Sequence, residues 1–122
     1  MPECPLVLVT SEVSPGIWTV EIQGPLEAAN LSSLRAVIGD LFSRGIYRFI
    51  LDLEKITYIS SSGFSCFVAS VDIARKNGGE IIFSTPSPDV RGAFHLLGLS
   101  QMLRLVRDLK SAIAAFSQPA AS

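Results

Sequence analysis

The sequence lacks the long apolar runs, cysteine pairs and leader signals that place a protein in a membrane or an oxidising compartment. No apolar run in the 122 residues approaches the roughly 18 residues that a membrane-spanning helix needs. The first residues, Met1 to Pro5, lack the positive flank of a secretory signal peptide. The two cysteines, Cys4 and Cys66, are too few for a disulfide framework. We therefore expect a cytoplasmic protein that does not insert into a membrane.

Charge is also scarce. Only 17% of the residues are charged, and the formal net charge is −1. No run of Lys and Arg occurs along the chain, which argues against nucleic acid as the main ligand. No basic amphipathic helix suited to a membrane surface is present either. A surface with few charges is typical of a protein that reserves apolar area for a partner, although a larger core accounts for it equally well.

Motifs for catalysis and cofactor binding are missing as well. A nucleophile elbow reads Gly-x-Ser-x-Gly, and the stretch from Tyr58 to Gly63 lacks the first glycine. The single histidine, His95, has no orienting partner in the sequence. No glycine-rich phosphate loop occurs, and the acids Glu27, Asp52 and Glu54 are too scattered for a metal site. We predict that the protein is not an enzyme and holds no metal or cofactor.

What the chain does contain is an alternation of strand-like and helix-like segments. Its length suits one domain, residues 1–122, with a core over about 6–116 and a disordered tail at 117–122. Apolar periodicity predicts strands at 6–10, 17–23, 47–53, 80–84 and 102–106, and helices at 31–44, 61–76, 88–97 and 109–116. Capping residues mark the helix ends: Asn30, Ser87 and Asp108 before helices, Gly45 and Gly78 after them.

The order of these elements is β-β-α-β-α-β-α-β-α, which is an α/β pattern. Strands 6–10 and 17–23 are joined by a Pro-Gly turn and should form an antiparallel hairpin. The later strands alternate with helices, so their pairings should be parallel. We expect a mixed, mostly parallel sheet of about five strands with helices packed against it. Residues 24–30 and 60–63 follow strands and should lie at its functional edge.

Three consecutive serines and a glycine, Ser60-Ser61-Ser62-Gly63, stand at the start of the second helix. A serine oxygen there can accept a hydrogen bond from a free N–H of the first turn, so capping alone could explain one of them. A helix start is also where a phosphate is best tolerated. The alternative interpretation is that one serine is phosphorylated, which would switch binding of a partner with little change in shape.

Four segments, taken in order, resemble the STAS domain of bacterial anti-sigma factor antagonists. Residues 20–27 resemble the family's strand that ends in Gly-Glu-Leu-Asp, residues 49–53 its central strand, residues 59–63 its Asp-Ser-Ser-Gly motif, and residues 78–80, 87–90 and 97–99 its last third. The resemblance covers residues 6 to 116 and implies a single STAS domain.

The resemblance also implies a function and a set of partners. The family's phosphorylated serine follows the motif aspartate, which places it on Ser61, with Ser62 and Ser60 as less favoured acceptors. The unmodified protein would bind an anti-sigma factor that is also a serine kinase, and so release a sigma factor. Phosphorylation would break that complex, and a PP2C-type phosphatase would restore it. The protein would be the substrate of this chemistry.

The sequence departs from the family motifs at three positions. Ser60 stands in place of the motif aspartate, Glu27 in place of the aspartate of Gly-Glu-Leu-Asp, and Pro25 in place of its glutamate. Loss of the first carboxylate removes a group that a kinase could recognise. It also removes repulsion against a phosphoserine. The alternative function is therefore a STAS adaptor, or a cytoplasmic subunit of a membrane transport system, without phosphorylation.

The expected partner surface combines the two loops at the sheet edge with the second helix. Its residues are Glu27, Ser60, Ser61, Ser62, Gly63 and Phe64, together with the exposed face of the helix. Phe64 lies three residues before the core position Phe67, so it is either buried or offered to a partner.

Overall fold

A single mixed sheet with helices on both faces makes up the fold. The computed structural model describes residues 6–117. In chain order the elements are β1 (Val7–Ser14), β2 (Ile17–Leu26), α1 (Leu31–Ser43), β3 (Arg48–Asp52), β4 (Ile56–Ile59), α2 (Ser61–Lys76), β5 (Glu80–Ser84), α3 (Pro88–Leu96), the short 3-10 helix η1 (Leu99–Gln101), β6 (Arg104–Val106) and α4 (Leu109–Ser117). The predicted tail, apart from Ser117, and Cys4 lie outside the described residues.

The sheet has the strand order β1-β2-β3-β5-β6, and β4 pairs separately with the end of β2. Strands β1 and β2 form an antiparallel hairpin. All the other pairings, β2 with β3 and β4, β3 with β5, and β5 with β6, are parallel. The predicted α/β class and mostly parallel mixed sheet are confirmed.

Within residues 6–117 the sheet has six strands, one more than the approximate five that the sequence predicts. The additional strand, β4, lies in the stretch that the sequence indicated only as a connection to the second helix. It has four residues, of which Ile56 and Ile59 are buried while Thr57 and Tyr58 are exposed. That pattern does not alternate with a period of two, so it lacks the usual signal of a half-buried strand. Strand β4 also alters the site, because it brings the serine turn beside the end of β2.

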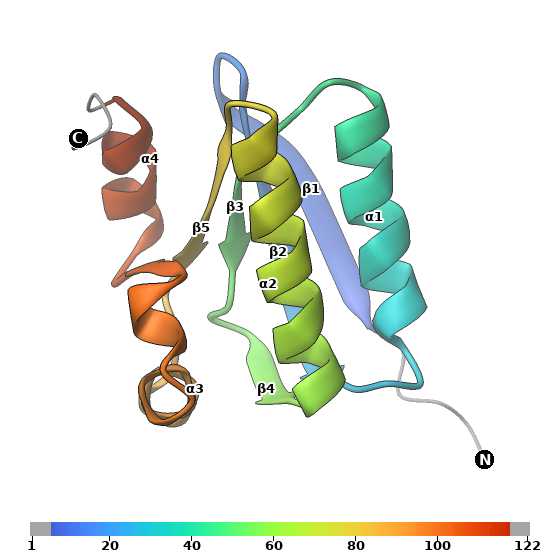
Figure 1. The fold of residues 1–122 in the computed structure, drawn as a ribbon, viewed down its shortest axis with the longest axis vertical. Coiled ribbons are helices and arrows are strands. Elements are labelled where there is room, and N and C mark those ends of the chain that lie inside the picture. The colour runs from blue at the N-terminus through green and yellow to red at the C-terminus, as the bar shows by residue number, and fades with distance from the viewer. Residues whose placement is uncertain (1–5, 118–122) are drawn as a thin grey trace.

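The sheet is covered on both faces, and Figure 1 shows α1 and α2 side by side over one of them. Helices α1, α2 and α3 share one continuous core with the sheet, in which Phe49 and Leu51 of β3 are fully buried. On the opposite face Ile50 of β3 packs with Ala112 and Ala115 of α4. The central position predicted for this strand, with apolar side chains on both faces, is therefore confirmed.

The helix boundaries follow the capping residues closely. Ser87 caps α3 by accepting a hydrogen bond from the Val90 N–H at 3.2 Å, and Asp108 accepts one from the Ser111 N–H at 2.7 Å. Gly45 and Gly78, each with a φ near +80°, follow α1 and α2 in the left-handed conformation that glycine adopts readily. Helix α2 spans the predicted residues 61–76.

Candidate functional site

The turn from β4 into α2 is held by three hydrogen bonds of Ser60. Its N–H donates to the Leu26 carbonyl oxygen at 2.9 Å. Its hydroxyl oxygen accepts from the Gly63 N–H at 3.2 Å, and its carbonyl oxygen accepts from the Phe64 N–H at 3.1 Å. The predicted capping role is therefore confirmed for Ser60, and its hydroxyl group is engaged within the turn.

Gly63 sets how closely the start of α2 approaches the sheet. It is buried, and a Cβ atom at this position would lie 2.9 Å from Cγ2 of Ile59 and 3.0 Å from Cδ2 of Leu26. Real Cβ contacts are almost never as short as 2.9 Å, so a larger residue would displace the Ile59 or Leu26 side chain or the helix itself. The close approach fixes the position of the serines relative to the sheet edge.

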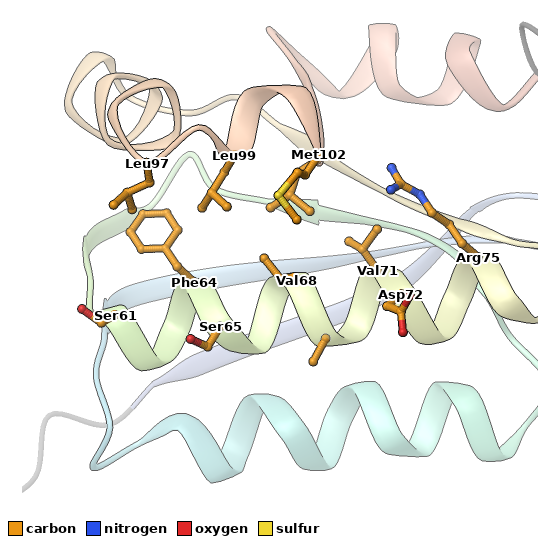
Figure 2. Close-up of a pocket in the computed structure, with 12 residues that line it drawn as sticks. Ser61, Phe64, Ser65, Val68, Val71, Asp72, Arg75, Leu97, Leu99 and Met102 are labelled. Carbon is orange, nitrogen blue, oxygen red and sulfur yellow. The ribbon is translucent and has the colours of Figure 1, made fainter.

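Ser61 is the serine that this packing leaves most accessible. Its side chain is exposed, whereas Ser62 is half-buried. In Figure 2 the Ser61 hydroxyl projects away from the first turn of α2. The first N–H groups of a helix have no intrahelical carbonyl to pair with, and Ser60 satisfies only those of Gly63 and Phe64. The first turn of α2 contains no acidic residue. The environment of Ser61 can therefore accommodate an anion.

The loop from β2 to α1 lies beside this turn because Leu26 pairs with Ile59 in the sheet. Glu27, the next residue, is exposed. Its N–H donates to Oδ1 of Asn30 at 2.9 Å, while Nδ2 of Asn30 donates to the Pro25 carbonyl oxygen at 2.8 Å. The two predicted edge segments, 24–30 and 60–63, are thus brought together.

The sequence predicted that the Asn30 side chain caps α1, and this detail is wrong. It occupies the N-cap position of α1, but its side chain makes no capping hydrogen bond to the helix. Instead the buried amide cross-links the preceding loop through the bonds to Glu27 and Pro25. These two hydrogen bonds help to fix the shape of the loop that presents Glu27.

An apolar groove of about 680 Å³ runs along α2 from Ser61 to Arg75. Its opposite wall is the segment from the end of α3 to β6, which contributes Leu97, Leu99 and Met102 (Figure 2). Leu97 and Met102 are 59% and 49% exposed, high values for apolar side chains. The sequence did not reveal this groove. The leucines that line it fit the apolar patterns of a helix and a strand, so they were predicted to be core residues.

The sequence left open whether Phe64 is buried or offered to a partner. In the structure its side chain is 8% exposed and belongs to the core. Its ring meets Phe94 of α3 edge-on at a centroid distance of 5.2 Å and Phe67 at 6.2 Å. The same side chain lines the groove near Ser61. A partner could therefore reach only the part of the ring that faces the groove.

The structure does not bring catalytic groups together around the serines. His95 lines a different pocket, on the far side of α3, and is not among the residues of the groove that contains Ser61. Between residues 6 and 117 no three His, Cys, Asp or Glu side chains form a group that could hold a metal ion. None of the helices between residues 6 and 117 combines the length and the apolar character needed to cross a membrane.

Two carboxyl groups outside the site have shifted pKa values: that of Asp108 is lowered, chiefly by hydrogen bonds from Ser111, and that of Asp52 is raised. Partial burial raises the pKa of Asp52 at the end of β3, and the nearby carboxylates of Glu54 and Glu21 act in the same direction. The Glu54 N–H, which donates to Oδ1 of Asp52 at 3.0 Å, opposes the shift. Lys55 forms an ion pair with Glu21 at 3.0 Å, and its positive charge acts to lower the pKa of Asp52.

Fold and site together define a mixed-sheet α/β domain with an exposed serine at the start of a capped helix. The model of the STAS domain family matches residues 9–112. The chain therefore belongs to the STAS domain family.

Similar proteins carry one recurring description. BtrV of Bordetella bronchiseptica, named as a candidate anti-sigma factor antagonist, is 28% identical over 108 residues, which is 88% of this chain and 93% of BtrV. An anti-sigma factor antagonist from Mycobacterium paratuberculosis has a TM-score of 0.84 at 20% identity, covering 93% of this chain and 95% of that one. The anti-sigma factor antagonist SpoIIAA in its unphosphorylated form has a TM-score of 0.72 at 20% identity, covering 93% and 100%.

Two further structures bear on the alternatives. SpoIIAA of Bacillus has also been solved in a phosphorylated form, which matches with a TM-score of 0.71 at 21% identity over 90% of this chain and 99% of that one. A sulfate transporter family protein from Wolinella succinogenes has a TM-score of 0.74 at 23% identity, covering 86% and 88%. At these identities the solved structures show the shared fold.

Replacing Gly63 with alanine should destabilise the protein. The added methyl group has to displace Ile59 or Leu26, which should cost about 1–3 kcal/mol. Thermal and urea unfolding of Gly63→Ala measure this loss. Gly39→Ala in α1 is the matched control, because a Cβ there meets nothing within 4 Å and should leave stability equal or slightly higher. Equal stabilities of the two variants would contradict the close approach at Gly63.

Proposed function

We infer that this protein is an anti-sigma factor antagonist that acts in the cytoplasm as a phosphorylation-controlled binding module. Unmodified, it binds an anti-sigma factor that has serine kinase activity, and this releases a sigma factor. The kinase transfers a phosphoryl group from ATP to the Ser61 hydroxyl, which ends the complex, and a PP2C-type phosphatase removes it. The observation that carries the proposal is an exposed serine at the start of α2, beside an apolar groove, in a STAS domain.

Accessibility supports Ser61 as the acceptor among the three serines. The Ser60 hydroxyl accepts a hydrogen bond from the Gly63 N–H and is bound to the helix start. Ser62 is half-buried, whereas Ser61 is exposed. A kinase has to surround the acceptor hydroxyl with its own catalytic groups, so the exposed serine is favoured over the other two.

Electrostatics supports a switch that leaves the fold intact. A phosphoserine carries about −1.5 to −2 charges at neutral pH. At Ser61 it would lie near the positive end of the α2 dipole and near N–H groups that have no intrahelical partner. With serine at position 60 and no acid in the first turn of α2, no carboxylate of these residues repels it.

The same phosphate would oppose a partner that covers the groove. The groove is lined mainly by apolar side chains, and Ser61 lies at one end of it. Covering Ser61 when phosphorylated would require removing water from a dianion, which is costly unless a cation pairs with it. Each 1.4 kcal/mol of lost binding free energy weakens a complex about tenfold.

The partner surface that we propose joins this groove to the β2–α1 loop. It comprises Glu27, Ser60, Ser61 and Ser62, with Phe64 contributing through its groove-facing edge. Gly63, which the sequence analysis placed in this surface, is buried and supports the turn from beneath. Leu97 and Met102 extend the surface across the groove and supply exposed apolar area of the kind that protein interfaces bury.

A second candidate function, a STAS adaptor or a cytoplasmic subunit of a transport system, has one specific observation in its favour. Ser60 replaces the carboxylate of the family's phosphorylation motif, and a sulfate transporter family protein shares the fold. Affinity purification from cells separates the two functions. Recovery of a transporter component, without a kinase and without phosphate on the purified chain, would support the adaptor.

Incubation with the anti-sigma factor kinase and ATP should place a single phosphate on Ser61, located by tandem mass spectrometry. Ser61→Ala should abolish the modification, because the nearby hydroxyl groups are either engaged or less accessible. Ser65→Ala is the matched control, since Ser65 is exposed one turn later and lines the same groove. Unchanged phosphorylation of Ser61→Ala would refute the assignment.

Charge reversal at Glu27 should weaken the complex with the anti-sigma factor about tenfold while leaving the melting temperature nearly unchanged. The Glu27 side chain is exposed, so its replacement by lysine should not disturb the core. Calorimetric titration measures the affinity. Glu12→Lys, the same change near the hairpin at the far end of β1, should bind as the unmodified chain does. A large fall in the stability of Glu27→Lys would instead assign Glu27 a structural role.

A further inference from the structure

A second pocket, of about 860 Å³, lies between α3 and the segment where β6 leads into α4. It is separate from the groove beside Ser61, and the two share no lining residue. Leu105, Val106 and Pro88 provide its apolar surface. The polar groups around it are two hydroxyls, of Ser100 and Ser111, and three nitrogen-bearing side chains, Arg91, His95 and Arg107.

The periodicity of α3 explains why these side chains gather on one side. Val90 and Phe94, four residues apart, are buried in the core. Pro88, Arg91 and His95, at spacings of three and four, lie together on another face of the same helix and line the pocket. Arg107, twelve residues after His95, enters the pocket because β6 runs parallel to β5 and returns the chain beside α3.

The positive charges of the pocket are poorly neutralised. Among the described residues Arg91 forms no ion pair, whereas Arg44, Lys55 and Arg75 each have a carboxylate within 3.3 Å. Arg107 is 3.8 Å from Asp108, a long contact, and its side chain is 83% exposed.

Two carboxylates lie close to the pocket in sequence. The Asp108 carboxylate accepts the Ser111 N–H at 2.7 Å and thus caps α4. Asp89 is two residues before Arg91 and therefore on another side of α3. Neither carboxylate lines the pocket, although that of Asp108 contacts two lining residues, Ser111 and Arg107.

We propose that this pocket binds a small organic phosphate. Guanidinium groups match the oxygens of a phosphate in bidentate geometry, and Arg91 and Arg107 offer two of them from different elements. The Ser100 hydroxyl supplies a further hydrogen bond, whereas the Ser111 hydroxyl is hydrogen-bonded to the Asp108 carboxylate. Leu105, Val106 and Pro88 form a surface for an apolar or aromatic body attached to the phosphate.

A titration with phenyl phosphate, followed by amide chemical shifts of the full chain, tests the site. Saturating shifts should map to Gly92, Ser100 and Ser111, with a dissociation constant of about 1 mM, as expected for a small ligand held by two charge-assisted contacts. Phenol, which has the aromatic ring without the phosphate, and inorganic phosphate, which lacks the ring, should each bind more weakly than phenyl phosphate. Inorganic phosphate binding as tightly as phenyl phosphate would overturn the role given to the apolar surface.

Charge reversal identifies the groups that hold the phosphate. Arg91→Glu and Arg107→Glu should each weaken phenyl phosphate binding about tenfold or more. Arg35→Glu on α1 makes the same change of net charge at an exposed arginine outside the pocket and should have no effect. Equal weakening by all three variants, or shifts that do not map to the pocket, would overturn the proposal. Thermal unfolding of each variant confirms that it is folded, and the outcome is independent of phosphorylation at Ser61.

Discussion

The close contact between the start of α2 and the ends of β2 and β4 determines most of what the site can do. Gly63 allows this contact, since any Cβ atom would meet Ile59 and Leu26. Ser60 stabilises it with hydrogen bonds in both directions, to the Leu26 carbonyl oxygen and from the Gly63 N–H. With Ser60 engaged in the turn, Ser61 becomes the first helical residue and is left exposed. The sheet thereby positions a hydroxyl group at the positive end of a helix and beside an apolar groove.

Local sequence signals predicted the parts of this arrangement that depend on local physics. Caps at Ser60 and Ser87, the bounds of α2, and the doubly buried strand β3 all follow from capping preference and periodicity. Strand β4 was missed because its pairing is with the distant end of β2 and its four residues carry no alternating pattern. Asn30 was placed correctly at a helix start, but its bonds to the preceding loop depend on loop geometry that spacing does not encode.

The groove and the second pocket could not be predicted for a related reason. Whether an apolar residue such as Leu97 is buried or exposed depends on how much of the sheet and helices covers it, and that is a property of the assembled fold. Arg91 and Arg107 are separated by fifteen residues, so they form no cluster along the chain and meet only through the parallel return of β6. The segment from α3 to β6 separates the two cavities, with Leu99 lining the groove and Ser100 lining the pocket.

The central claim is that a phosphate on Ser61 changes binding without changing the fold. The most direct measurement compares the phosphorylated and unmodified chains by amide chemical shifts and by titration with the anti-sigma factor. We expect shift changes confined to the β4–α2 turn and the adjacent β2–α1 loop, together with a loss of affinity of at least about a hundredfold, or about 2.7 kcal/mol. Equal affinities of the two forms, or shift changes spread through the sheet, would contradict the account.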